Sequence, residues 1–134
     1  MKSFNEQSAV QFLKEVRKPL LTLHKSILDH ERAAHEKIVG PITPAAFLQE
    51  LISGTSFRWI GPLSTAIANI DELLEEDEKV TADDRIAGAE AVAALFAPDS
   101  HDSPFRQRYL ALLQESPAIL HEHGRVVQVL HNVE

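Results

Sequence analysis

Apolar residues recur at helical spacing along almost the whole chain, and prolines mark where new helices should begin. A hydroxyl residue directly before proline occurs at Thr43-Pro44, Ser103-Pro104 and Ser116-Pro117. Serine and threonine are favoured N-caps, and proline is favoured in the first helical turn. We find neither the alternation of a half-buried strand nor an internal repeat of 20 to 50 residues. The sequence therefore predicts an all-α fold.

These signals divide the chain into about six or seven helices. Ser3 and Glu6 fit a capping box that opens the first, and Pro19 either starts a second helix or lies in a kinked continuation. Gly40-Pro41 should end that helix, because glycine accepts a left-handed cap and proline cannot continue a helix. Later helices are expected to start at Thr43, near Ser56 (unless the segment before Gly61-Pro62 is a separate turn), at Thr81, at Ser103 and at Ser116.

The chain has 134 residues, the size of one ordinary domain, and it can bury a core without disulfides or metals. Its apolar fraction of 44% is close to that of globular proteins. We therefore expect one domain spanning residues 1–134, built as an antiparallel helical bundle.

Charge and composition exclude several classes of function. A formal charge of −7 argues against a general role in nucleic-acid binding, which depends on a basic face. The absence of cysteine removes disulfides, thiolate metal sites and a cysteine nucleophile. No apolar run approaches the roughly 20 residues that span a bilayer, and Met1–Glu15 is unlike a secretion signal. We expect a soluble bacterial cytoplasmic protein with neither nucleic acid nor membrane as a partner.

Three ionisable side chains fall on the apolar face of the second predicted helix: His24, Glu31 and His35. Buried polar groups are costly unless they find partners. On the fourth predicted helix, Ser64 and Asp71 also lie on the apolar side, two turns apart. If these helices pack antiparallel, the five side chains can meet. The sequence predicts a buried polar network that fixes helix register, with a ligand pocket or a solvated rim as alternatives.

A metal site is the chemical alternative for the same stripe. His24, Glu31, His35 and Asp71 would supply two imidazoles and two carboxylates, which suit zinc or iron in a bundle core. The local motifs are imperfect, because Glu31 and His35 have one residue more between them than the zinc-protease or ferritin-like patterns allow. The sequence therefore requires no cofactor, and zinc or iron belongs to this alternative only.

Two further groups combine aromatic and basic residues. Arg58 and Trp59 could form a ligand site for an anion or a stacked ring, whereas the alternative makes Trp59 an anchor that packs a helix start on the core. His121 and His123 are two residues apart and point to different sides of a helix. We expect these two histidines on a solvated face.

Short motifs spread over most of the chain carry a resemblance. They are His24-Lys25, Leu28-Asp29, Glu31-Arg32, Gly40-Pro41-Ile42, Phe57-Arg58-Trp59-Ile60, Pro62-Leu63-Ser64, Ile70-Asp71-Glu72, and Phe105-x-x-Arg108-Tyr109 before Ser116-Pro117. Together they resemble a family of small, all-helical bacterial proteins of uncharacterised function. The resemblance implies a soluble helical domain, and it carries over no catalytic residue.

The sequence favours a non-enzymatic binding or interaction module. It has no phosphate-binding glycine loop, no nucleophile elbow, no dinucleotide fingerprint and no recognisable catalytic triad. The first predicted helix carries Ala9, Phe12, Leu13 and Val16 on one face, which could dock on a partner protein or on a second copy. The alternatives are the metal-binding bundle and a small-ligand pocket at Arg58 and Trp59.

Overall fold

The computed structural model describes residues 4–54, 57–75, 78–97 and 103–132. Its elements are α1 (Glu6–Val39), α2 (Pro44–Ser53), a 3₁₀ turn η1 (Arg58–Ile60), α3 (Gly61–Leu73), α4 (Ala82–Phe96), α5 (Pro104–Glu115) and α6 (Pro117–Asn132). These described residues contain no strand, and the helices pack against one another. The predicted all-α bundle is confirmed.

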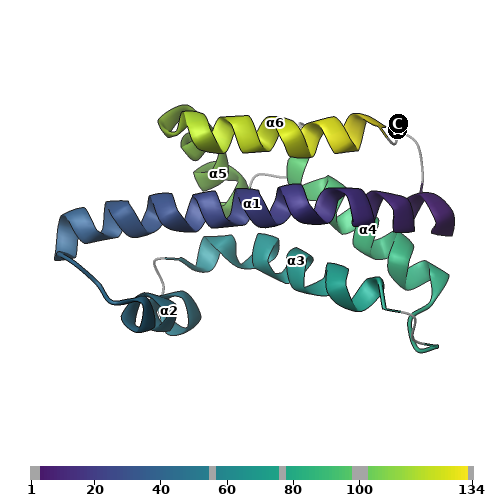
Figure 1. Cartoon of the computed structure of the whole chain (residues 1–134), viewed down its shortest axis with the longest axis horizontal. Coiled ribbons are helices and arrows are strands. Elements are labelled where there is room, and N and C mark those ends of the chain that lie inside the picture. The colour runs from purple at the N-terminus through teal and green to yellow at the C-terminus, as the bar shows by residue number, and fades with distance from the viewer. Residues whose placement is uncertain (1–3, 55–56, 76–77, 98–102, 133–134) are drawn as a thin grey trace.

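Helix α1 is the spine of the bundle. It is 34 residues long, and α3 and α6 run antiparallel to it along different sides (Figure 1). Helix α4 packs on both α1 and α3, whereas α5 packs on α6 and on η1. Helix α2 lies to one side, beyond the bundle formed by the others (Figure 1). Among the described residues, no helix combines the length and apolar character that crossing a bilayer requires.

The core follows the apolar face of α1 from its first turns to beyond its middle. Fully buried residues of this helix are Ala9, Phe12, Leu13, Val16, Leu20, Leu23 and Ile27. The other helices close around them with Leu63, Ile70, Val92, Tyr109, Leu112, Ile119 and Val126. The other helices bury residues of the stripe that their apolar spacing predicts, whereas α2 buries only Phe47 and leaves Leu48 and Ile52 exposed.

Helix α1 is continuous through Pro19, so the second of the two sequence-based alternatives is correct. Proline removes one helical hydrogen bond and crowds the preceding turn. The buried side chains of Val16 and Leu20 flank it on both sides, and their packing holds the helix together. The N-cap is Asn5, whose side chain accepts from the backbone N–H of Ser8 at 2.8 Å. Ser3, which the sequence placed in the capping box, lies outside the described residues.

The other predicted helix ends are largely confirmed. The hydroxyls of Thr43, Ser103 and Ser116 each accept from the backbone N–H three residues later, at 3.1 to 3.2 Å. Thr81 also caps its helix, and Asp84 returns a hydrogen bond to the Thr81 backbone at 3.0 Å. These contacts satisfy N–H groups that the first helical turn leaves unpaired.

Two further boundaries depend on glycine. Helix α1 ends where predicted, at Gly40, whose positive φ of 90° is a conformation that favours glycine. The fourth predicted helix starts later than the expected position near Ser56, which lies outside the described residues. The segment before Gly61 forms η1, and α3 then begins at Gly61.

Candidate functional site

The predicted polar network divides into separate contacts, and one of them joins α1 to α3. The ring Nε2 of His24 lies 2.9 Å from the hydroxyl oxygen of Ser64. This contact is the only part of the five-residue set in which two members meet directly. Burial lowers the pKa of His24 below its ordinary 6.5, because a buried imidazole is harder to charge. The pair therefore holds a neutral histidine at neutral pH.

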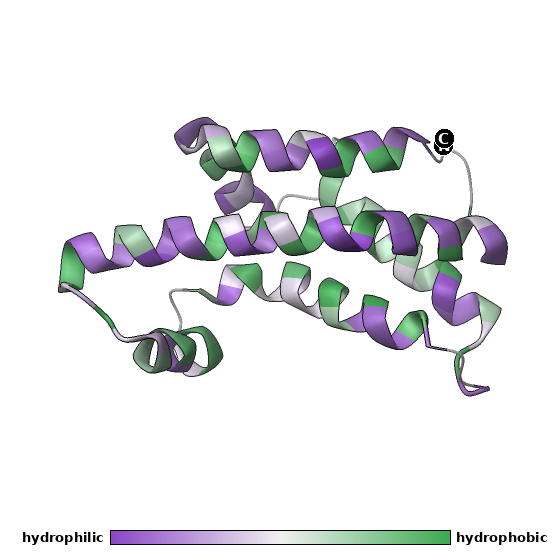
Figure 2. Ribbon diagram, viewed as in Figure 1, coloured by the Kyte–Doolittle hydropathy of each residue, from purple (hydrophilic) through white to green (hydrophobic). Residues whose placement is uncertain are grey.

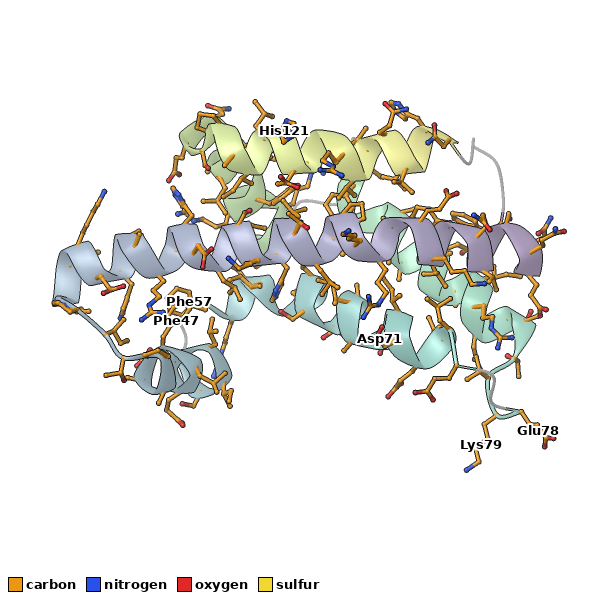
Figure 3. The ribbon with its side chains drawn as sticks, viewed as in Figure 1. Phe47, Phe57, Asp71, Glu78, Lys79 and His121 are labelled. Carbon is orange, nitrogen blue, oxygen red and sulfur yellow. The ribbon has the colours of Figure 1, made fainter. Side chains whose placement is uncertain are left out.

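Asp71 does not join this pair, and the antiparallel register explains why. Moving seven residues along α3 from Ser64 leads to Asp71, and the matching seven-residue step back along α1 from His24 leads to Arg17. The carboxylate of Asp71 accepts from Nε of Arg17 at 2.6 Å, and both side chains are exposed. The side chain of Asp71 lies on the outer edge of the α1–α3 contact (Figure 3). Its predicted place in a buried network is wrong.

Glu31 is buried and faces α5 instead of α3. Its Oε1 accepts from Nη2 of Arg108 at 2.7 Å, and Nη1 of Arg108 donates to Glu115 at 2.9 Å. Nε2 of His30 lies 3.4 Å from the other oxygen of Glu115. Burial alone would lower the pKa of Arg108, but the hydrogen bonds and charges of the two carboxylates raise it. The predicted network at Glu31 is replaced by an ion-pair bridge between α1 and α5.

His35 contacts aromatic side chains. Its ring meets Phe57 edge-on at 5.7 Å between centroids, and Phe57 meets Phe47 of α2 in the same way at 5.4 Å. Figure 3 shows the rings of Phe47 and Phe57 beside each other between α1 and α2. His35 therefore takes part in packing α2 and η1 against the far end of α1.

These separate contacts contradict the predicted metal site. His24, Glu31, His35 and Asp71 have four different sets of neighbours, so the predicted ligands do not converge. In the part of the chain that the structure describes, no three histidine, cysteine, aspartate or glutamate side chains are grouped to hold a metal ion.

The His24–Ser64 pair lies in a pocket between α1, α2 and the start of α3. The pocket has a volume of about 290 Å³ and opens to the surface. Its lining residues are His24, Leu28, Leu51, Phe57, Arg58, Ile60, Gly61 and Ser64. The walls are mostly apolar, and the polar groups that line the pocket are the imidazole of His24, the hydroxyl of Ser64 and the guanidinium of Arg58.

Arg58 and Trp59, predicted as a joint ligand site, point to different places. Arg58 is exposed and lines the pocket, and its guanidinium makes no hydrogen bond or ion pair with another described residue. Trp59 is half-buried, and its ring lies 6.0 Å from that of Phe105 on α5. Trp59 thus has the packing of the anchor in the sequence-based alternative, and only Arg58 contributes to the pocket.

The His24–Ser64 distance is within the reach of a general base and a nucleophile. A catalytic histidine is usually oriented by a third group on its other ring nitrogen. No acidic side chain among the described residues hydrogen-bonds that nitrogen of His24. His24 and Ser64 therefore form a polar edge of the pocket, at which the Ser64 hydroxyl could hydrogen-bond a ligand.

The sequence analysis missed a partly buried polar contact between α5 and α6. The hydroxyl of Tyr109 lies 2.6 Å from Nδ1 of His123, inside a group of rings with Phe96 and Phe105. Burial raises the pKa of Tyr109, whereas burial and the charge of Arg106 lower the pKa of His123. The prediction of a solvated His123 is therefore wrong. The available signal was Tyr109 itself, because a tyrosine on an apolar helix face needs a partner for its hydroxyl.

Large apolar side chains gather at the end of the molecule formed by α2 and the last turn of α1. Their exposed fractions are 85% for Ile38, 60% for Val39, 56% for Leu48 and 72% for Ile52. Figure 2 shows α2 as a largely apolar helix at this end. We call these four residues the apolar end. Phe47 is the only buried residue of α2, so most of this helix faces outward.

Polar contacts fix the position of α2 despite its limited packing. Nη2 of Arg32 donates to the carbonyl of Ile42 at 2.8 Å, and a carboxylate oxygen of Glu36 accepts from the Ile42 N–H at 3.2 Å. The Arg32 guanidinium also lies over the ring of Phe47, at 5.6 Å from its centre. The linker before α2 is thereby tied to α1, and the apolar end is presented in a defined orientation.

Comparison with protein-family models, with curated proteins and with solved structures finds no match for this chain. The family resemblance of the short motifs stays an expectation, and the function has to be argued from the geometry of the chain itself.

Proposed function

We propose that the chain is a non-enzymatic interaction module that associates with a second copy of itself through the apolar end. The observation that carries this proposal is the exposure of Ile38, Val39, Leu48 and Ile52 at one end of the molecule. Large apolar side chains that are exposed together at one end of a protein typically mark a site of protein interaction.

The location differs from the one expected from the sequence. The apolar face of the first part of α1 was a candidate docking surface, but Ala9, Phe12, Leu13 and Val16 are fully buried. A partner cannot reach them in the folded protein. Deleting residues 1–17 would remove core side chains, so loss of association in such a deletion would say nothing about an interface.

A second copy fits the chemistry of the apolar end. A two-fold interface brings the same patch of each copy together, so the patch must be complementary to itself. On α2, Leu48 and Ile52 share the outer side of a helix that has no basic residue and only one acidic residue, Glu50. Two such surfaces can therefore meet with little repulsion between like charges.

The distribution of acidic residues supports the same arrangement. Glu72, Glu75 and Glu78 are exposed near the junction of α3 and α4. Figure 3 shows Glu78 at the opposite end of the molecule from α2. Association through the apolar end would keep these carboxylates far apart in a chain with a net charge of −7.

The test is the dependence of molecular mass on concentration, measured by sedimentation equilibrium. We expect a reversible dimer for the wild type and a monomer for the double variant Leu48→Ser/Ile52→Ser, because a fully buried leucine or isoleucine contributes about 1.5–3 kcal/mol. The matched control is Leu120→Ser, which removes an exposed leucine from α6 and should leave the dimer intact. Circular dichroism verifies the helicity of each variant.

Two outcomes would contradict the proposal. One is a wild type that stays monomeric at every concentration, and the other is a dimer that Leu48→Ser/Ile52→Ser leaves unchanged. The bacterial cytoplasm is the setting that we propose for this module, as the sequence led us to expect. The acidic charge supports a protein partner over nucleic acid.

A further inference from the structure

We propose that the pocket formed by Arg58, Ser64 and the apolar side chains around them binds a small organic carboxylate with an apolar tail. This function is separate from self-association and does not depend on it. Three independent features support it: the shape of the pocket, an arginine that pairs with no described residue, and a hydroxyl oriented by a half-buried histidine.

The pocket has the size and walls of a site for a short-chain acid. Its volume of about 290 Å³ lies near the lower limit for small-molecule sites. The apolar walls come from separate parts of the chain: Leu28 of α1, Leu51 of α2, Phe57 directly before η1, and Ile60 at the end of η1. These walls would surround a hydrocarbon tail of a few carbons, and their apolar contact would provide much of the affinity.

Arg58 supplies the charge that a carboxylate needs. Its guanidinium is exposed at the pocket and makes no ion pair with another described residue, although acidic side chains outnumber basic ones in this chain. The planar donors of arginine match the two oxygens of a carboxylate. An unpaired arginine beside an apolar pocket therefore favours an anion with an apolar body over a neutral ligand.

Ser64 and His24 supply a second, directional contact. With Nε2 protonated, the neutral His24 ring donates to the Ser64 oxygen across 2.9 Å, which leaves the Ser64 O–H free to donate to a carboxylate. Burial keeps His24 in its neutral form near neutral pH. The two residues thus hold one hydroxyl donor at the edge of the pocket.

Gly61 is a position at which an added side chain would fill the pocket. It lines the pocket in an ordinary helical conformation, and a Cβ atom added there would meet no atom within 4 Å. A leucine side chain at this position would take up space that the ligand would use. Because Pro62 follows and disfavours a helical backbone for a residue that carries a Cβ atom, circular dichroism and urea unfolding of Gly61→Leu verify that the fold is kept.

The experiment is a titration of the ¹⁵N-labelled chain with hexanoate, followed by backbone amide shifts in NMR, with hexanamide as the uncharged probe. We expect saturable shifts centred on residues 57–64, and about tenfold weaker binding of hexanamide. Arg58→Gln should weaken hexanoate binding about tenfold, and Gly61→Leu should abolish it. The matched control is Arg125→Gln, an exposed arginine on α6, which should leave the binding unchanged.

The same titration in the Leu48→Ser/Ile52→Ser background keeps this proposal distinct from self-association, and we expect unchanged affinity there. The proposal is overturned by hexanoate that gives no saturable shift. Equal affinity for hexanoate and hexanamide would overturn it too, as would an equal loss of affinity in Arg58→Gln and Arg125→Gln.

Discussion

The buried carboxylate of Glu31 accepts a hydrogen bond from Arg108 at 2.7 Å, and this contact links residues 77 positions apart in the chain. It joins the middle of α1 to α5. Burying a carboxylate without a partner costs free energy of folding. Glu31 therefore needs Arg108 as its partner in order to be buried.

Replacing Arg108 with methionine should lower the free energy of unfolding by about 3 kcal/mol, because it leaves the buried charge of Glu31 unpaired. Urea unfolding measures this loss. The double variant Glu31→Leu/Arg108→Met should regain part of it, since no charge is then stranded. Arg108→Met with wild-type stability would show that Glu31 is solvated in the folded protein.

Replacing Pro19 with alanine should raise the free energy of unfolding by about 2 kcal/mol. Proline inside a helix costs about 3 kcal/mol relative to alanine, and its smaller loss of chain entropy on folding offsets part of that. Chemical denaturation of the two proteins tests this. Lower stability of Pro19→Ala would mean that the proline itself makes a necessary contact.

Lowering the pH below 6.5 should reduce the free energy of unfolding. The pKa values of His24 and His123 lie below their ordinary 6.5, through burial at both sites and through the charge of Arg106 at His123. The unfolded chain therefore binds more protons below pH 6.5, so acid favours unfolding, and the stability is regained above that pH. Thermal melts across this range, kept above pH 4.5, measure the slope.

The double variant His24→Gln/His123→Gln should flatten that slope. His121→Gln is the control, because the His121 side chain is exposed on α6. A slope that survives the double variant would assign the pH dependence to other groups.

Tyr109→Phe should lower the free energy of unfolding by about 1 kcal/mol, because it removes the 2.6 Å contact and leaves Nδ1 of His123 without its partner. Differential scanning calorimetry gives the change. The control is Phe105→Leu, which alters the same group of rings without touching a hydrogen bond and should lose stability through packing alone. An unchanged His123 titration by NMR in Tyr109→Phe would contradict the role of the hydroxyl.

Local signals made the helices predictable. A cap such as Thr43 or Ser103 acts within its own first turn, and apolar spacing identifies the buried side of a helix without reference to its neighbours. These local signals could not decide whether Pro19 starts a new helix or lies within a continuous one. The cost of a proline is local, whereas the packing of Val16 and Leu20 that outweighs it belongs to the tertiary structure.

The candidate site was harder to predict because α1 changes neighbours along its length. At His24 this helix contacts Ser64 of α3, whereas two turns later, at Glu31, it contacts Arg108 of α5. Residues on one helical stripe therefore reach different partners. The apolar stripe of α1 indicated which polar side chains would need hydrogen-bond partners. Which residues those partners are is decided only by how the helices pack.

Thiol cross-linking can locate the surface through which two copies meet, since the natural chain contains no cysteine. Ala45 is exposed on α2 three residues before Leu48, and Ala91 is exposed on α4. With a short bismaleimide, Ala45→Cys should give a covalent dimer in high yield, while Ala91→Cys should stay monomeric under the same conditions. Cross-linking that is absent at Ala45→Cys, or equal at the two positions, would contradict association through α2.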